Sequence, residues 1–295
     1  MGPLSPDGSG AIRGVPDEDI RGLGTALGVA LFGAEEIALI DPNLPERRWT
    51  PLLGQPRLTH AANDSWAMVA SSAGAAGDEE YSRLARSLSV SLRAAGLQLR
   101  NASDEYNKQL EAALANGQQI GLRFSNVAMD DLHLACHALL SEMASARDYL
   151  ARVAGLRVGA PDNIDALARL RQWLSRPVNS AALRDPLVQR LLLDSDSTSS
   201  DPWLHDVGEY RNLFLHREHI GAMAPWLTLE LRDSPIGQVR TIAMAINVRP
   251  GDPHTCDALT RFVDLHTRLC RLADFGAQLA PFDATPPAFS ESTSG

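Results

Sequence analysis

The sequence predicts a mainly α-helical protein in which several long helices form a bundle. Ala and Leu dominate the composition and aromatic residues make up only 5%, a balance that favours helices over sheets. Several stretches also repeat apolar residues at spacings of three and four, the period of a helix with one buried face. With 295 residues, the chain is long enough for one large domain or two small ones.

The first 75 residues are expected to precede the bundle. Residues 1–16 are rich in Gly, Pro and Ser and are expected to be a disordered lead-in. Residues 17–75 are interpreted as an N-terminal helical extension with helices over 17–40 and 58–71, separated by an irregular connection. The first helix is predicted from the apolar spacing of Ile20, Leu23, Leu27 and Leu31. The irregular connection is predicted from four prolines, Pro42, Pro45, Pro51 and Pro56.

The bundle itself is predicted over residues 78–280. Its first segment, 79–114, carries an apolar stripe made of Leu84, Leu88, Leu92, Ala95 and Leu99. Gly96 and the polar run 101–104 leave open a division of this segment into two helices. A second long helix is predicted over 124–153, followed by shorter ones over 161–175, 181–194 and 202–219.

A small β-hairpin is predicted over about 226–248, before the last helix. Residues 227–231 alternate apolar and polar side chains, 233–237 form a turn, and alternation resumes at Ile242, Met244 and Ile246. A final helix is expected over 256–279, and the tail 281–295, rich in Pro, Ser and Thr, is expected to be disordered.

Charge and cysteine content limit the classes of partner and compartment. A net charge of -9 argues against a broad basic face for nucleic acid or for a membrane surface, but not against a small basic pocket. The three cysteines share no metal-type spacing and suggest a reducing compartment. Because no signal peptide and no run of roughly 20 apolar residues is found, a cytoplasmic protein without a membrane partner is expected.

The predicted helix over 202–219 contains the one chemically suggestive stretch, from Arg211 to His216. Asn212 and His216 are four residues apart and share a face of the helix. Arg211 and His216 lie about 140° apart around the axis and roughly 7.5 Å apart along it. A separate apolar face that can anchor the helix is formed by Val207, Tyr210, Leu213 and Phe214.

The pattern Arg-Asn-x-x-x-His, preceded by an aromatic residue, resembles the signature of the HEPN superfamily (higher eukaryotes and prokaryotes nucleotide-binding). The likeness extends over residues 80–280, including Trp203-Leu204, Asp131-Leu132-His133 and the run Arg147-Asp148-Tyr149-Leu150. It implies a HEPN-type helical bundle, often dimeric. It also implies a metal-independent endoribonuclease of the kind found in toxin–antitoxin, CRISPR-associated and antiphage systems.

The resemblance assigns roles to single residues. His216 would be the general base or acid at the RNA 2′-hydroxyl, and Arg211 would hold the scissile phosphate. Asn212 would orient the histidine or bind phosphate, while Arg217 and His219 would add positive charge for RNA binding. No metal or other cofactor is implied. The implied partners are RNA, a second copy of the chain in a homodimer, and an antitoxin or other protein.

Other interpretations stay open. The looser pattern Arg-x4-His also occurs at Arg249/His254, in a proline-containing loop, and at Arg261/His266, on a helix with Phe262. The runner-up function is a non-catalytic helical interaction module, in which the polar residues of the motif bond to neighbouring helices or loops. A third is a metal-dependent bundle enzyme in which His133 and His137, four residues apart, are joined by His216 and His219, although structural histidines are favoured. The pair Arg147–Asp148 is expected to be a structural ion pair, with support for the site as its alternative.

Overall fold

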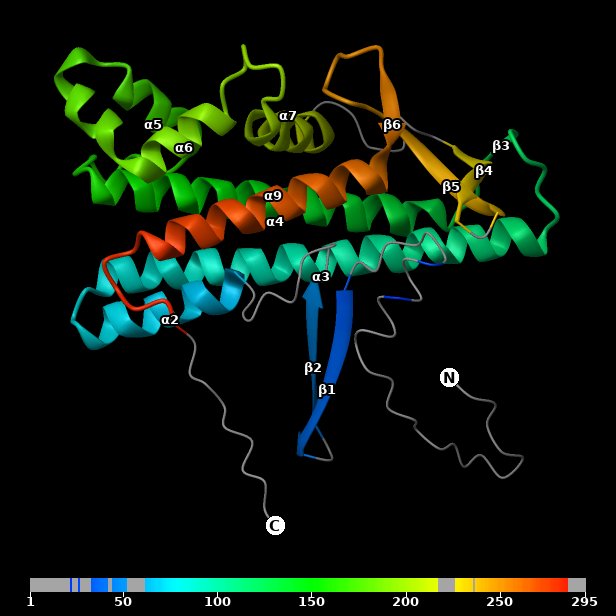
Figure 1. The fold of residues 1–295 in the computed structure, drawn as a ribbon, viewed down its shortest axis with the longest axis horizontal. Helices are drawn as coiled ribbons and strands as arrows, with labels where there is room; N and C mark the ends of the chain where they lie inside the picture. The colour runs from blue at the N-terminus through cyan, green and yellow to red at the C-terminus, as the bar shows by residue number, and fades with distance from the viewer. Residues whose placement is uncertain are drawn as a thin grey trace.

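The computed structural model describes residues 22, 26, 33–41, 44–51, 62–216, 226–235 and 237–285, with the backbone alone for 33–41, 44–51, 215, 216 and 234. As predicted, this part of the chain is mainly helical and carries a small antiparallel sheet. Figure 1 shows three levels of helices, with α2 and α3 below, α4 and α9 across the middle, and α5, α6 and α7 above. None of the helices described is long and apolar enough to cross a membrane.

The two longest helices, α3 (Glu79–Ala115) and α4 (Met129–Arg157), pack along each other and form the centre of the bundle. Every residue of the predicted stripe from Leu84 to Leu99 is buried. Asp78 caps the start of α3 by accepting a hydrogen bond from the backbone N–H of Tyr81 at 3.0 Å. Because the stripe continues through Gly96, α3 is one helix of 37 residues and is not divided.

The first and last helices close the core against this pair. In α2 (Ala62–Ala75), the fully buried Trp66 donates its indole N–H to the carbonyl oxygen of Ala273, in α9 (Ala258–Gln278), at 2.9 Å. Gly276 lets α9 approach closely, since a Cβ there would lie 3.2 Å from the Trp66 ring. Residues 281–285, expected to be disordered, also pack here, with the ring of Phe282 5.0 Å from that of Tyr81.

The short helices are α5 (Leu167–Leu174), the 3-10 helix η1 (Pro177–Arg184), α6 (Pro186–Asp194) and α7 (Trp203–His216). The helix predicted over 181–194 therefore begins later, at Pro186. Asp185 explains this start, because its carboxylate accepts hydrogen bonds from the N–H groups of Leu187 and Val188 at 2.9 and 3.1 Å. Similarly, α5 begins after the predicted start at 161, and α4 begins at 129 and not at 124.

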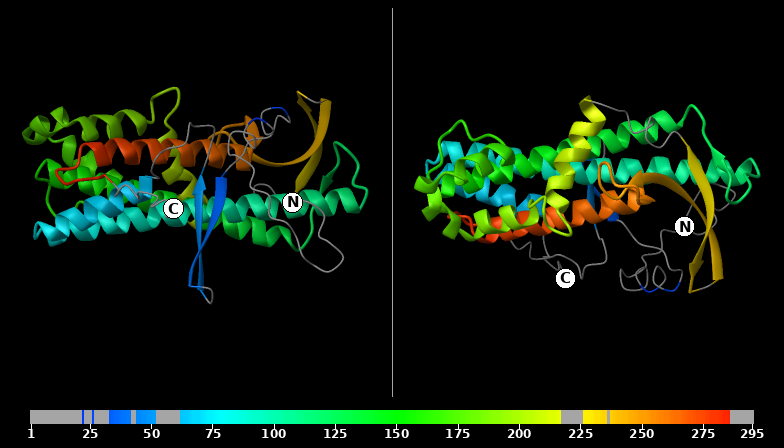
Figure 2. Two further views of the ribbon diagram at one scale, coloured as in Figure 1. Left: turned by 60° about the horizontal axis from the view of Figure 1, so that its bottom comes forward. Right: turned by 90° about the horizontal axis from the view of Figure 1, so that it is seen from above.

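The predicted hairpin is present as β4 (Leu227–Ser234) and β5 (Gly237–Asn247). Two short strands that were not predicted, β3 (Arg123–Phe124) and β6 (Thr255–Asp257), extend it to an antiparallel sheet of order β3-β4-β5-β6. The alternation works as expected, since Leu227, Leu229, Ile242 and Met244 are all buried. The sheet thereby covers one end of the bundle (Figures 1 and 2).

The helix predicted over 17–40 is wrong for its last eight residues, 33–40. Residues 33–41 form strand β1 (Gly33–Asp41), which pairs with β2 (Leu44–Pro51) in an antiparallel two-stranded sheet. The helical spacing ends at Leu31, and Gly33 is a poor helix former. Across the strands Glu36 is the register partner of Arg48, a pairing of backbones that helical periodicity cannot reveal. The lead-in 1–16 and the tail 286–295 lie outside the described residues.

Candidate functional site

Helix α7 carries the predicted motif. It packs against α4, α6 and α9, and Figure 2 (right) shows it crossing the long helices at a steep angle. The predicted apolar face is confirmed, because Val207, Tyr210 and Phe214 are buried and Leu213 is half-buried. One side of the helix is therefore held by the core, and the opposite side is left for polar residues.

Tyr210, the aromatic residue directly before the Arg-Asn pair, fixes the rotation of α7. Its hydroxyl lies at hydrogen-bond distance from two carbonyl oxygens at the end of β5, those of Asn247 and, at 2.6 Å, of Val248. Its ring stacks on Phe214 at 5.8 Å and meets the edge of Phe262 at 6.1 Å. Burial raises the pKa of the Tyr210 phenol well above its ordinary value, so the group stays neutral and donates its proton.

With Tyr210 turned inward, the next two residues emerge at the surface side by side. Asn212 is exposed, Arg211 is half-buried, and Nη1 of Arg211 lies 3.3 Å from Oδ1 of Asn212. Among the described residues, no carboxylate forms an ion pair with Arg211. Its charge is therefore not committed to a structural pair within that part of the chain, and the guanidinium can accept an anionic ligand.

His216 is the last described residue of α7, and its backbone is helical. The structure thus confirms that Asn212 and His216 are four residues apart on one helix. The side chain of His216 is not described, and Arg217 and His219 lie outside the described residues. The motif is therefore placed by its helix and by two of its three proposed catalytic side chains.

The rival pair on α9 is built into the core. His266 is fully buried, and burial lowers its pKa to about 4, so that the imidazole is neutral. Its closest polar contact is the Sγ atom of Cys270, 3.8 Å from Nε2. The other rival, Arg249/His254, lies in the loop between β5 and β6. Neither pair combines a helix with an open position for substrate, so α7 remains the candidate.

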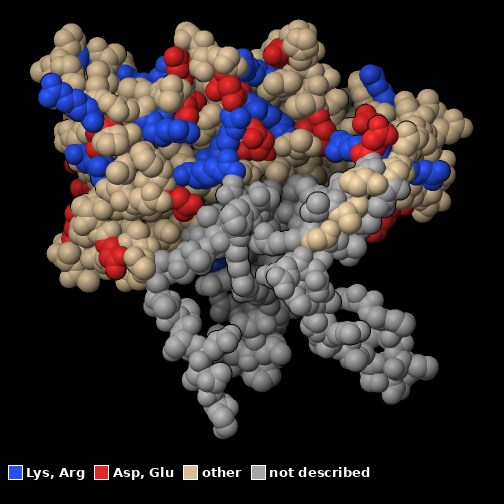
Figure 3. All heavy atoms as spheres, in the orientation of Figure 1, with Lys and Arg blue, Asp and Glu red and all other residues tan. Residues whose placement is uncertain are grey.

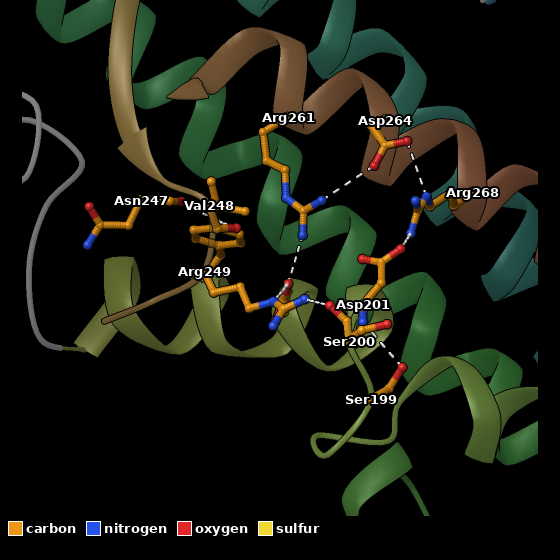
Figure 4. A network of polar contacts seen from close by, with 11 residues as sticks. Ser199, Ser200, Asp201, Asn247, Val248, Arg249, Arg261, Asp264 and Arg268 are labelled. Carbon is orange, nitrogen blue, oxygen red and sulfur yellow. Dashed lines mark hydrogen bonds and ion pairs between the residues drawn. The ribbon is translucent and has the colours of Figure 1, made fainter. Parts of the chain in front are cut away.

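A network of charged residues, which the sequence analysis missed, holds the start of α7. The Asp206 carboxylate, only 2% exposed, accepts a hydrogen bond from Nη2 of Arg261 at 2.7 Å, and Nε of Arg249 lies 3.7 Å away. Figure 4 shows Arg249 and Arg261 reaching toward each other from the loop after β5 and from α9. Arg268 continues the network by pairing with Asp201 and with Asp264. Three arginines face three aspartates, so the network is a neutral structural clamp and offers no net charge to a ligand.

Arg147 of α4 touches α7 close to the motif. As predicted, it forms an ion pair with Asp148, whose Oδ1 lies 3.0 Å from Nε and 2.9 Å from Nη2 of Arg147. The same oxygen accepts the backbone N–H of Leu167 at 3.2 Å, at the start of α5. The guanidinium lies against Gly208, where an added Cβ would be 1.9 Å from Nη1. Gly208 is thus a close-approach position between the two helices.

Two other candidate sites, the histidine pair of α4 and a surface hollow along α3, are poorly suited to bind a metal or a phosphate. No three His, Cys, Asp or Glu side chains of the described residues gather as a metal site would require, so ligands beyond them would have to join His133 and His137. The ring of His137 lies 5.7 Å from that of Phe214 and takes part in packing. A surface hollow along α3 is lined by Asp104, Glu105 and Glu111 together with one lysine, an acidic surrounding that would repel phosphate.

Charges of both signs mix over the face that Figure 3 presents, in keeping with the prediction that a broad basic surface is absent there. A ligand at α7 would therefore be bound by single side chains and not by a broad charged surface.

Comparisons with models of protein families, with curated proteins and with solved structures give no match for this chain.

Proposed function

We propose that the chain is a metal-independent endoribonuclease of HEPN type that works as a homodimer through Arg211, Asn212 and His216. The observation that carries the proposal is the pairing of Arg211 and Asn212 at the surface, directly after a tyrosine that is locked into the core. A rigid helix anchored in this way can hold polar groups in a fixed geometry, which catalysis requires. The mainly helical fold of the described residues agrees with the proposal.

In the proposed reaction, an RNA 2′-hydroxyl attacks the adjacent phosphorus. The imidazole of His216 takes the hydroxyl proton, a role suited to a group that titrates near neutrality. The bond from phosphorus to the 5′-oxygen breaks, and that oxygen receives a proton from the second His216 of the homodimer. The products are a 2′,3′-cyclic phosphate and a free 5′-hydroxyl, with no change in oxidation state.

Arg211 and Asn212 would handle the charge of the phosphate. The guanidinium of Arg211 would donate to the two non-bridging oxygens, whose negative charge grows as the 2′-oxygen attacks. Because no carboxylate of the described residues pairs with Arg211, it does not need to break an ion pair with any of them first. The exposed amide of Asn212 would orient the imidazole of His216 or bind the phosphate as a second donor.

The test is cleavage of a mixed single-stranded RNA in the presence of EDTA. We expect the wild type to release 2′,3′-cyclic phosphates, and Arg211→Ala and His216→Ala to lower the rate by roughly 10²-fold or more. Arg169→Ala is the matched control, because Arg169 is an exposed arginine of α5 whose guanidinium contacts Asp165 and the carbonyl oxygen of Asn163, both in the loop before this helix. Equal rates in all four proteins, or cleavage abolished by EDTA, would overturn the mechanism. Sedimentation of the wild type tests the homodimer.

A non-catalytic interaction module is the second candidate, favoured by one specific observation. Apolar side chains are exposed around the connection between α3 and α4, where Val127 is 89%, Leu122 52% and Ile120 44% exposed. Such a group is typical of a surface that contacts another protein, and an antitoxin or other partner of a defence system would be such a protein. An absence of RNA cleavage by the pure wild type would favour this candidate.

A further inference from the structure

Arg147 is held against the helix that carries the motif, and Gly208 is what lets it lie there. The position that a Cβ of residue 208 would occupy is 1.9 Å from Nη1, 3.0 Å from Cζ and 3.4 Å from Nη2 of Arg147. Every residue other than glycine would therefore collide with the guanidinium. Glycine is the least favourable helix residue after proline, so its presence inside α7 needs a reason from packing or from function.

Arg147 and Arg211 belong to the same interface. Gly208, Arg211 and Phe214 are spaced by three residues and form one row along α7. The two ends of this row contact α4, Gly208 through Arg147 and Phe214 through His137. Arg211, the middle member, therefore lies on the side of α7 that borders α4, which explains why it is half-buried.

The two cations are associated with neighbouring positions along α7. Gly208 and Arg211 are three residues apart on a helix, which is roughly 4.5 Å along the axis. Arg147 lies against the first position and Arg211 extends from the second, so both side chains belong to the same stretch of α7. We expect adjacent phosphates of a single strand to meet one of these two cations each.

The hydrogen bonds of Arg147 engage one edge of its guanidinium, while Nη1 lies on the side that faces Gly208. Nε and Nη2 both face Oδ1 of Asp148, which fixes the plane of the group. Nη1 makes no hydrogen bond to any residue that the structure describes, and the side chain keeps 15% of its surface exposed. An arginine oriented by a carboxylate at one edge, with donors left at the other, is prepared for an anionic ligand.

We infer that Arg147 is a second phosphate-binding residue of the α7 site and contacts the RNA phosphate adjacent to the scissile one. This inference rests on the proposed function. The competing interpretation is structural, in which Arg147 only attaches α7 and α5 to α4. The two differ in what they predict for the salt dependence of RNA binding, because only a phosphate contact releases counterions.

The experiment measures binding of a labelled single-stranded RNA by fluorescence anisotropy between 50 and 300 mM salt. All proteins carry His216→Ala so that the RNA stays intact. Arg147→Gln is compared with Arg152→Gln, a change of equal charge on the same helix, where Arg152 pairs with Glu80 of α3. We expect Arg147→Gln to weaken binding about tenfold and to lower the slope of log K against log salt by about 0.7. Arg152→Gln is expected to keep the slope of the parent protein, which carries His216→Ala alone.

Gly208→Ala is the second variant, and it keeps the charge of Arg147 while pushing its guanidinium aside. It is expected to weaken RNA binding as Arg147→Gln does, with a melting temperature no lower than that of the parent. Gly155→Ala, at a glycine of α4 where a Cβ would be 3.4 Å from its nearest neighbour, controls for a general effect of an added methyl group.

The outcomes separate the two proposals. In the first outcome, the His216→Ala parent binds RNA and the wild type cleaves it, but Arg147→Gln has the same slope of log K against log salt as the parent or as Arg152→Gln. Arg147 is then structural, and the inference is overturned while the ribonuclease proposal stands. If the wild type neither binds nor cleaves RNA, the proposed function itself fails, and the inference fails with it.

Discussion

Replacement of Tyr210 by phenylalanine tests whether the hydroxyl of this residue holds α7 in place. The change removes one oxygen atom and keeps the ring, with its contacts to Phe214 and Phe262. The lost hydroxyl belongs to a fully buried side chain and lies at hydrogen-bond distance from the carbonyl oxygens of Asn247 and Val248. Its distance to the Val248 oxygen is 2.6 Å. A buried hydrogen bond of this kind contributes about 1–2 kcal/mol to the free energy of unfolding.

The expected change is large enough to measure. A loss of about 1–2 kcal/mol lowers the melting temperature of a unit of this size by roughly 2–8 °C. Thermal unfolding and urea titration, both followed by circular dichroism, give the two quantities independently. Because Arg211 and Asn212 follow Tyr210 directly, we also expect a looser α7 and a lower rate of RNA cleavage.

The matched control is Tyr149→Phe. Tyr149 is half-buried in α4, and its hydroxyl makes no hydrogen bond to the described residues, so removing this oxygen should change stability by less than about 0.5 kcal/mol. If Tyr210→Phe is as stable as Tyr149→Phe, the two carbonyl contacts do not hold α7, and the explanation of why the motif faces outward is wrong.

Two further predictions concern His266 of α9 and Asp257, the residue that caps the start of this helix. Since burial lowers the pKa of His266 from 6.5 to about 4, the unfolded chain binds a proton below pH 6.5 that the folded chain excludes. Stability should therefore fall between pH 6.5 and 4 by about 1.4 kcal/mol per pH unit relative to His266→Leu, and parallel curves in urea titrations would contradict this. Asp274, whose pKa burial raises to about 6, has the opposite slope but is common to both proteins and cancels in the difference. Asp257→Ala removes the cap of α9 and the carboxylate that accepts the Tyr106 hydroxyl at 2.7 Å, and should lower the free energy of unfolding by about 2–4 kcal/mol. Asp162→Ala, at an exposed position, should leave it unchanged within about 0.5 kcal/mol.

Those parts of the fold that depend on local periodicity could be predicted from the sequence. The stripe from Leu84 to Leu99 and the alternation around Ile242 each report a face that the chain must bury, and both faces are buried. The strand β1 could not be found in this way. Its backbone pairs with that of β2, with Glu36 in register with Arg48, and a pairing between strands leaves no mark in the period of a single segment.

The candidate site likewise has one part that local periodicity predicts and another part that it does not. The helix around Arg211 and its apolar anchor follow from spacing within α7. The groups that position this helix come from far along the chain, because Asp206 meets Arg261 across 55 residues and Tyr210 meets Val248 across 38. Such partners have no fixed separation in sequence, so a three-dimensional arrangement is needed before they can be recognised.

Gly208 shows how a local signal and a distant partner combine. A glycine inside a helix is about 1 kcal/mol less favourable than alanine, so stability alone would favour alanine at this position. The three atoms nearest to the new methyl group all belong to the guanidinium of Arg147, a flexible side chain that could swing away. Contact with Arg147 therefore does not by itself require a glycine. A requirement that Arg147 keep its place against α7 does, and this requirement links Gly208 to the proposed chemistry of the site and not only to the stability of the bundle.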